Sequence, residues 1–336
     1  MTNFSSFLQR NIKKYPHSTT SDYLKLIYQS EFGPGHLIKS KSSSLNYLIE
    51  EIESIKVIND NNVLYEYISN DFIRVNLDIY KKYNLDLCKL NTLFQETSML
   101  IHKDNLSKKL DILESCIGPS EDITAFRSTP VQMHHSEIYK KYYDPHYRLI
   151  SSNLIDSNFK SLLLDDYLSN LSKKLPNNKI YFIALEGRCC SGKTTLTKNI
   201  KNASVIHADD FFSNTSEPLD FNRLKNVLLN LEPNKINTYE IFNCMSKNIN
   251  DAYSFKKTDI LKKIVIVEGV YSYHEAIRDI YDEVIYINSS DNQLQRLLNR
   301  CNGNSDLYNK FINIWIPREE LYFNSFDFIK NASIII

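Results

Sequence analysis

The stretch GRCCSGKTT, residues 187–195, decides how the second half of this chain folds. It fits the pattern G-x-x-x-x-G-K-[ST], which is typical of loops that hold nucleotide phosphates. The sequence has 7 Gly in 336 residues, and two of them, Gly187 and Gly192, fall in this loop. A β-rich run, 179–187, precedes the loop, and a helical pattern, 195–202, follows it. We therefore predict a phosphate-binding loop between a strand and a helix.

The residue types of this loop explain how it would bind a nucleoside triphosphate. Consecutive backbone N–H groups and a helix N-terminus point at one anion. Lys193 would reach the β- and γ-phosphate oxygens, and the Thr194 hydroxyl would hold Mg²⁺. We predict that ATP and Mg²⁺ are the cofactors. The predicted nucleotide-binding residues are Gly187, Arg188, Cys189, Cys190, Ser191, Gly192, Lys193, Thr194 and Thr195.

Two adjacent cysteines, Cys189 and Cys190, lie at variable positions of the loop. One interpretation is that these positions accept any small residue. The other is that the nearby helix N-terminus favours thiolates, so that oxidation would inhibit nucleotide binding. We expect blocked thiols to impair ATP binding.

The two halves of the sequence show different patterns. Residues 178–336 alternate apolar strand-like runs with helical patterns, which predicts an α/β P-loop NTPase domain with a doubly wound parallel sheet. Its later strands are expected at 204–212, 263–269, 283–290 and 332–336. Residues 1–172 repeat apolar residues at helical spacing and predict a mainly α-helical domain of unknown role. The linker is expected at 173–179, where Pro and Asn occur.

Carboxylates follow two of the predicted strands. Asp209 and Asp210 end the second strand, and Glu268 ends the third. Ligands of parallel sheets bind outside the carboxyl ends of the strands. Asp209 could accept the proton of an attacking hydroxyl, and Glu268 could serve Mg²⁺ directly or through water. The alternative is that the two Asp residues cap a loop or help to hold Mg²⁺.

A predicted helix near 293–300 carries Arg296 and Arg300 four residues apart, on one face. Paired guanidinium groups are suited to clamping phosphate oxygens and stabilising transferred charge. A solvated basic face is the alternative.

Taken in order, GRCCSGKTT, HADDFF, IVIVEGVYS, YDEVIYINSS and QRLLNR resemble the uridine kinase and phosphoribulokinase-like group of P-loop kinases. The resemblance covers about 178–336. It implies that Asp209 is the general base, that Glu268 supports Mg²⁺, and that Arg296 and Arg300 close over the phosphates. It also places Phe212 near the acceptor. Together with Lys193, the predicted catalytic residues are Asp209, Arg296 and Arg300, and the predicted substrate contacts are Asp210, Phe212 and Tyr239.

The chain departs from uridine kinases in the segment that would recognise a nucleoside. Tyr239 matches the family's Tyr, but Glu240 replaces an Asp and Cys244 stands where a His is expected. The nucleoside is therefore in doubt, whereas the kinase chemistry is not. In the run 315–323, the residues Trp315, Glu319 and Tyr322 would either contact substrate or pack a closing helix.

The helical half contains a second group of polar and aromatic residues. His134, His135, His146 and Arg148 lie close in sequence, and Arg74 is a further candidate. A metal site, an anion or substrate site, and ordinary packing are the three interpretations. The three histidines lack a recurrent metal-ligand spacing.

The overall composition limits the classes of partner and the cellular compartment that we expect for the protein. The formal net charge is zero, which argues against a nucleic-acid binder. No apolar run reaches membrane-span length, and the start of the chain shows no signal-peptide pattern. With six Cys and no secretion signal, we expect a cytoplasmic protein with reduced thiols. A homo-oligomer stays open.

The sequence thus predicts an ATP- and Mg²⁺-dependent kinase that phosphorylates a hydroxyl of a small molecule, such as a nucleoside, a sugar or a related metabolite. Two alternatives remain: a nucleotide-gated regulatory protein, and a bifunctional enzyme with a second site in the helical half. A kinase acting on RNA ends is disfavoured by the neutral charge.

Overall fold

In the computed structural model, the described residues are 4–34, 38, 40–56, 62–100, 105–143, 145–177, 179–213, 217–242, 253–260, 262–288 and 293–336. The chain divides into two units, Met1–Asp156 and Ser157–Ile336. Cys244, whose position bears on nucleoside recognition, lies outside the described residues.

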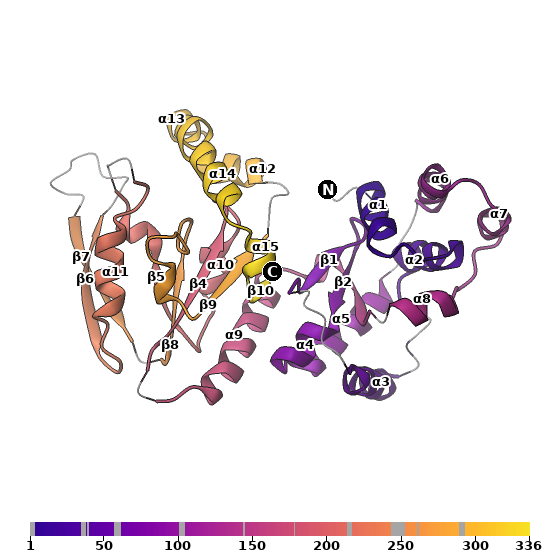
Figure 1. Ribbon diagram of the computed structural model, residues 1–336, viewed down its shortest axis with the longest axis horizontal. Helices are drawn as coiled ribbons and strands as arrows, with labels where there is room; N and C mark the ends of the chain where they lie inside the picture. The colour runs from indigo at the N-terminus through magenta and orange to yellow at the C-terminus, as the bar shows by residue number, and fades with distance from the viewer. Residues whose placement is uncertain are drawn as a thin grey trace. The chain divides into compact units, whose positions relative to one another are not determined.

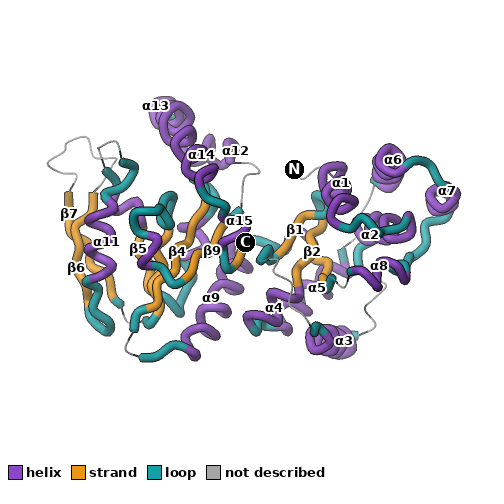
Figure 2. Tube along the Cα trace, in the orientation of Figure 1, coloured by secondary structure: helices purple, strands orange, loops and turns teal. Residues whose placement is uncertain are grey.

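The first unit combines helices with a small sheet (Figures 1 and 2). Its elements are α1 (Phe4–Lys14), α2 (Thr20–Phe32), α3 (Lys41–Ser54), β1 (Tyr65–Tyr67), β2 (Phe72–Asn76), α4 (Leu77–Tyr83), α5 (Leu87–Met99), α6 (Leu106–Ile117), α7 (Glu121–Ser128), α8 (Glu137–Tyr142), β3 (Tyr147–Ser151) and a 3₁₀ turn (Ser152–Leu154).

The sheet of the first unit was not predicted from the sequence. Its strand order is β1-β2-β3 with antiparallel pairing, and every residue of the central strand β2 is buried. Apolar side chains of α1, α2 and α6, including Phe7, Leu24 and Leu110, pack with Phe72 in one core. The β2 sequence FIRVN is too short and too mixed for its periodicity to separate strand from helix.

The second unit contains the phosphate-binding motif. Its elements are α9 (Ser157–Lys174), β4 (Tyr181–Gly187), α10 (Lys193–Thr197), β5 (Ser204–His207), a 3₁₀ turn (Ala208–Phe211), α11 (Phe221–Leu229), β6 (Ile236–Phe242), β7 (Tyr253–Asp259), β8 (Ile264–Glu268), a 3₁₀ turn (Arg278–Ile280), β9 (Glu283–Ile287), α12 (Gln293–Cys301), α13 (Ser305–Lys310), a π-helical turn (Phe311–Trp315), α14 (Ile316–Ser325), α15 (Phe328–Asn331) and β10 (Ile334–Ile335).

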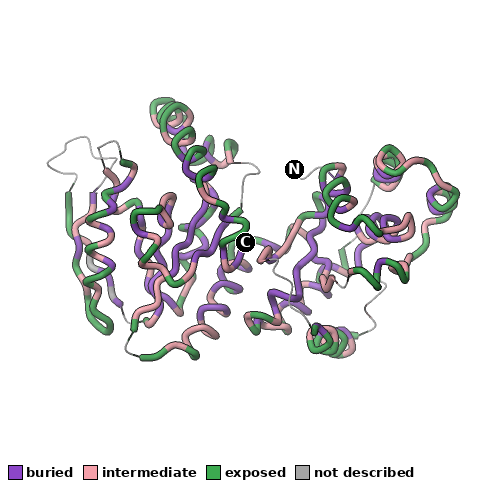
Figure 3. Tube along the Cα trace, in the orientation of Figure 1, coloured by how far each residue is buried: buried purple, intermediate pink, exposed green. Residues whose placement is uncertain are grey.

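The predicted parallel sheet is confirmed. Five strands pair in the order β10-β9-β4-β8-β5, all parallel, so their carboxyl ends lie at one edge. Figure 1 shows β4 among these strands, with the α12–α14 helices beyond their ends. Strands β4, β8 and β9 carry mostly buried residues (Figure 3). The sequence expected the second strand to reach residue 212, but it ends at His207 and turns over Ala208–Phe211.

Helix α9 belongs to the second unit, although the sequence assigned it to the first. The Ser161 hydroxyl donates to the Leu196 carbonyl oxygen at 2.8 Å, and Asp165 accepts from the N–H groups of Lys201 and Asn202. These bonds attach α9 to the segment around α10. The linker predicted at 173–179 therefore follows α9 and lies inside the second unit.

An antiparallel hairpin, β6–β7, was also missed by the sequence analysis. It pairs Ile236 with Asp259 and Phe242 with Tyr253. Tyr239 of β6 packs with Phe211 and the core beneath α11.

None of the helices in the described part of the chain has the length and apolar composition that a bilayer span requires.

Asp22 holds two helix starts of the first unit together. Its buried carboxylate accepts five hydrogen bonds, from the backbone and hydroxyl of Thr19, the backbone and hydroxyl of Ser136, and Nδ1 of His135. Thr19 precedes α2 and Ser136 precedes α8, so one side chain orders both.

We predict that Asp22→Ala lowers the unfolding free energy of the first unit by about 3 kcal/mol, because five partly buried donors lose a charged acceptor. Asp111→Ala is the matched control, since Asp111 is largely exposed and makes a surface ion pair with Arg127. Thermal unfolding followed by circular dichroism, with hydrogen exchange of the 19–23 amides, tests this. Equal effects of the two substitutions would contradict it.

Candidate functional site

The loop 187–195, the predicted phosphate loop, has the backbone that its glycines allow. Gly192 lies at φ +95° and precedes the first residue of α10. At Gly187, a Cβ atom would lie 2.9 Å from the carbonyl oxygen of Ile287 in β9. A side chain at either position would strain or displace the loop, so glycine permits the tight turn between β4 and α10.

Lys193 is buried at the centre of this loop. Its ammonium donates to the carbonyl oxygens of Gly187 at 2.6 Å and Arg188 at 2.9 Å. The carbonyl groups of the loop therefore hold the positive charge of Lys193 inside the turn.

Thr194 and Glu268 lie together at the sheet edge. The Thr194 hydroxyl donates to Glu268 Oε1 at 2.9 Å, and His207 Nδ1 lies 2.5 Å from the same oxygen. The parallel pairing of β5 with β8 sets His207 opposite Glu268. Burial acts to raise the pKa of Glu268, but the hydrogen bond and charge of His207, with the Lys193 charge and the Thr194 bond, hold it below its usual value.

Asp209 lies in the turn that follows β5 and lines one cavity together with Lys193, Thr194 and Glu268. Asp209 is exposed at the cavity, and protein atoms surround its carboxylate. Partial desolvation by these atoms and the negative charge of Glu268 raise the pKa of Asp209, against the opposing charges of Lys193 and Arg300. A carboxylate with a raised pKa is a better proton acceptor for a hydroxyl.

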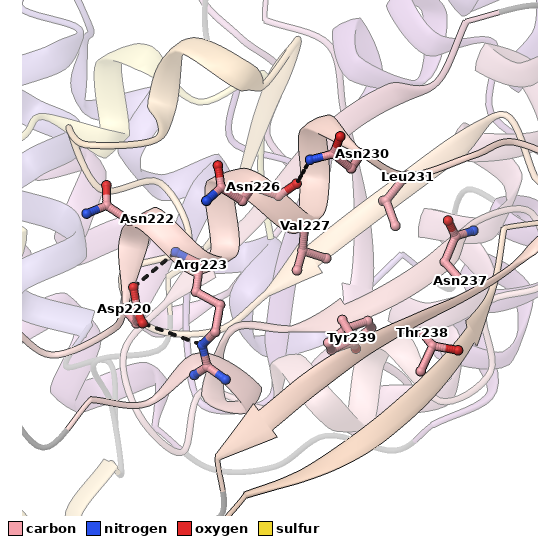
Figure 4. A pocket seen from close by; sticks show the side chains of 10 residues that line it. All are labelled: Asp220, Asn222, Arg223, Asn226, Val227, Asn230, Leu231, Asn237, Thr238 and Tyr239. Atoms are coloured by element: carbon pink, nitrogen blue, oxygen red, sulfur yellow. Dashed lines mark hydrogen bonds and ion pairs between the residues drawn. The ribbon is translucent and has the colours of Figure 1, made fainter.

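Asp210 is directed to the hairpin instead. Its Oδ2 accepts from the Tyr239 hydroxyl at 3.0 Å and from the Lys256 ammonium at 2.7 Å. Tyr239 lines a separate cavity of about 530 Å³ between α11 and β6, together with Arg223 and several Asn residues (Figure 4). The structure therefore does not bring Asp210 and Tyr239, two predicted substrate contacts, into the cavity of the phosphate loop.

Three arginines line the cavity of the phosphate loop. Arg296 and Arg300 come from α12, as the sequence indicated, and Arg318 comes from α14. Arg318 was not predicted from the sequence, although it lies in the run 315–323. The only sign of Arg318 in the sequence was that a basic residue lies between Trp315 and Glu319.

Helix α14 is anchored to the loop by two side chains from the run 315–323. The Cys189 N–H donates to Glu319 Oε2 at 2.9 Å, and the Tyr322 hydroxyl donates to Glu186 Oε2 at 2.8 Å. Trp315 lines the cavity, its ring edge-on to Phe212 with centroids 6.5 Å apart. Of the three predicted candidates, Trp315 and Glu319 face the cavity, and Tyr322 serves packing.

The cavity itself measures about 670 Å³. It joins the loop residues 189–195 with Asp209 and Glu268, and its apolar wall includes Phe212, Leu219 and Val270. A volume of this size is typical of small-molecule sites.

Glu186 is a buried carboxylate that the sequence analysis did not single out. Its oxygens accept from the N–H groups of Gly187 and Tyr273 and from the hydroxyls of Ser272 and Tyr322. Burial raises its pKa to about 7, although Lys193 and these donors oppose the rise. The available signal was one acidic residue inside an apolar strand.

In the first unit, the predicted polar group separates into two sets. Arg148 and His146 both contact Glu51, whereas His135 contacts Asp22. Arg74 is buried, with its Nε 2.6 Å from Glu66 Oε1. Within the described residues, no three His, Cys, Asp or Glu side chains are grouped so that they could hold a metal ion.

No family model matches the sequence, and no curated protein matches it. Among solved structures, the chain is similar to a possible uridine kinase from Bacillus stearothermophilus, at 19% identity and a TM-score of 0.37, over 52% of this chain and 98% of that one. It is also similar to a candidate fructose transport system kinase from a Silicibacter species, at 16% identity and a TM-score of 0.40, with 52% and 98% covered.

We predict that Glu186 makes stability depend on pH. Because its pKa in the folded protein is raised above the ordinary value, its contribution is fully present below about pH 4.5 and is lost as pH rises through about 7. The unfolding free energy of the wild type minus that of Glu186→Gln should fall across this range by on the order of 3 kcal/mol.

Urea titrations at several pH values measure this difference, followed by the fluorescence of Trp315, the one Trp of the sequence. Glu232→Gln is the control, because Glu232 is exposed and pairs with Lys235 at the surface. A pH-independent difference between wild type and Glu186→Gln would contradict the assignment.

Proposed function

We propose that this protein is an ATP- and Mg²⁺-dependent kinase that transfers the γ-phosphate to a hydroxyl of a small molecule. One observation carries the proposal: a single cavity holds the phosphate loop with Lys193, the Thr194–Glu268 pair, the carboxylate of Asp209 and three arginines. Phosphoryl transfer depends on positioning and charge stabilisation, and this set supplies both.

The loop and the arginines bind the triphosphate in this proposal. Lys193 and the loop N–H groups hold the phosphates, while Arg296, Arg300 and Arg318 neutralise the charge that develops on the transferred group. Arginines on α12 and α14 also exclude water when these helices cover the site, which protects the γ-phosphate from hydrolysis.

The residues present fit Mg²⁺. Thr194 and Glu268 offer oxygen ligands, and the lowered pKa of Glu268 keeps that carboxylate ionised. Bound Mg²⁺ would neutralise phosphate charge. The His207 contact fixes the orientation of the Glu268 carboxylate.

Asp209 acts as the general base toward the acceptor hydroxyl. The cavity wall near it is apolar, with Phe212, Leu219 and Trp315, which suits an acceptor with a planar or apolar face beside its hydroxyl. Nucleosides, sugars and related metabolites meet this description.

A cytoplasmic location is part of the proposal, since Cys88, Cys116, Cys189, Cys190 and Cys301 are free thiols.

Asp209→Asn should reduce turnover at least 100-fold while ATP still binds, because the acceptor loses its base. Asp210→Asn is the comparator. Its carboxylate bonds to the hairpin, so we expect less than a tenfold loss. ADP release would be measured with Mg²⁺ across nucleosides, sugars, polyols and hydroxy acids, with ATP binding followed by Trp315 fluorescence.

The outcomes separate the proposal from its rivals. Turnover on one acceptor class that is lost in Asp209→Asn supports the kinase. ATP binding without turnover on any acceptor would instead favour a nucleotide-gated regulator. Turnover that survives Asp209→Asn but is lost in Asp210→Asn would reverse the assignment of the base.

Glu268→Gln should raise the Mg²⁺ concentration needed for half-maximal turnover about tenfold, because a carboxylate ligand is replaced by a neutral amide. Thr194→Val should act in the same direction. Turnover as a function of Mg²⁺ at saturating ATP provides the measurement. An unchanged Mg²⁺ dependence in both variants would remove these residues from the metal site.

A further inference from the structure

Glu319 of α14 places a carboxylate against the phosphate loop. Its Oε2 accepts a hydrogen bond from the Cys189 N–H at 2.9 Å, and both residues are buried. Glu319 also lines the cavity of the loop, as Lys193 does. Cys189 is among the residues predicted to bind nucleotide. An acidic group from another part of the chain is therefore bonded to an N–H group that is expected to face phosphate.

The backbone of the loop is of a kind that receives anions. Cys190 and Gly192 both have a positive φ, of +58° and +95°. Left-handed residues in a turn can direct successive N–H groups to one side, where these groups form a concave site for an anion. A carboxylate oxygen and a phosphate oxygen are alternative acceptors for such an N–H group. Glu319 thus occupies a position that also suits phosphate.

Helix α14 has contacts with β4 and the loop that do not depend on this bond. The Tyr322 hydroxyl donates to Glu186 Oε2 at 2.8 Å, and Arg188 Nη2 lies 3.0 Å from Glu320 Oε2. Neither contact uses an N–H group of the loop. The helix therefore keeps two contacts when the Glu319 bond opens, and only one side chain needs to move.

The surroundings of the Glu319 carboxylate compensate its charge only in part. Burial raises its pKa, and the Cys189 bond with the charges of Lys193 and Arg188 opposes the rise without cancelling it. Lys193 donates to the carbonyl oxygens of Gly187 and Arg188. A phosphate group carries more charge and more acceptor oxygens than a carboxylate, so it is the stronger partner for the same N–H group.

We propose that Glu319 is an internal competitor of the nucleotide, whose carboxylate holds the Cys189 N–H until a phosphate group displaces it. The contact lowers the affinity of the loop for nucleotide and for other phosphate anions. Displacement breaks one hydrogen bond and forms another, with no covalent change. The inference rests on the proposed function for the identity of the competing anion, which is the phosphate of a nucleotide.

Glu319→Gln tests this competition, because the amide keeps the size of the side chain and accepts from the Cys189 N–H without a charge. A neutral hydrogen bond is about half as strong as a charged one, so the loop should open more often. Calorimetry should show that ATP binds about tenfold more tightly than to the wild type, because apparent affinity scales with the fraction of open molecules. Inorganic pyrophosphate should show the same gain, and adenosine should show none.

Glu320→Gln is the matched control, because it removes the same charge from the next residue of α14, where the side chain is 48% exposed. We expect at most about a twofold change in ATP affinity, since solvent screens this charge. The loop N–H is followed by nuclear magnetic resonance of protein labelled with ¹⁵N-cysteine, with the Cys189 signal assigned from Cys189→Ser. Pyrophosphate should shift this signal, and at a lower concentration in Glu319→Gln than in the wild type.

The opposite role for Glu319 predicts the opposite result. If Glu319 only anchors α14, Glu319→Gln should bind ATP equally or more weakly, and either result overturns the proposal. A gain of the same size in Glu320→Gln would also overturn it, because removal of charge alone would then explain the gain.

A failure of the proposed function gives a different result. If neither the wild type nor Glu319→Gln binds ATP, the proposed function fails, and pyrophosphate still decides the competition. A lower midpoint for the Cys189 signal in Glu319→Gln supports it, whereas equal midpoints, or no shift in either protein, overturn it. Should Glu319→Gln not fold, the wild type decides: a Cys189 signal that saturating pyrophosphate leaves in place overturns the proposal, and a shifted signal supports it.

Discussion

The parallel pairing of β8 with both β4 and β5 is the constraint on which the site depends. This pairing sets Leu185, His207 and Glu268 at neighbouring positions near one edge of the sheet. Parallel strands bury both faces and leave their polar groups at the ends. Consequently the phosphate loop after β4, Asp209 after β5 and Glu268 at the end of β8 meet without any long-range side-chain recognition.

Two buried carboxylates connect helix α14 with the loop and with β4. Glu186 of β4 accepts a hydrogen bond from Tyr322 of α14, and Glu319 of α14 accepts one from the Cys189 N–H of the loop. Removing either partner would leave a buried polar group without its bond, which costs more than the bond itself contributes. Helix α14 is thereby held against the loop, and Arg318 is placed in the cavity as a result.

The sequence was most informative where function and local structure coincide. The loop 187–195, the strands that flank it and the acidic residues at strand ends could be predicted because glycine spacing and apolar runs are local signals. The hairpin β6–β7 could not, because its stability comes from pairing between segments and from Tyr239 packing on Phe211. Asp210 bonds to that hairpin, so the sequence alone could not show that Asp209 and Asp210 belong to different sites. Arg318 was missed for a similar reason, since its place depends on α14 packing.

The charged side chains that line the cavity influence one another's protonation. Four cationic side chains, Lys193, Arg296, Arg300 and Arg318, share it with the acidic Asp209, Glu268 and Glu319. Burial raises the pKa of Asp209 and of Glu319, and the charge of Glu268 adds to the rise for Asp209, whereas the pKa of Glu268 is lowered. Glu268 therefore remains the most firmly ionised acid, as a Mg²⁺ ligand requires, whereas the raised pKa of Asp209 suits proton acceptance. Environments that push the pKa values of neighbouring carboxylates apart in this way support the roles proposed for Asp209 and Glu268.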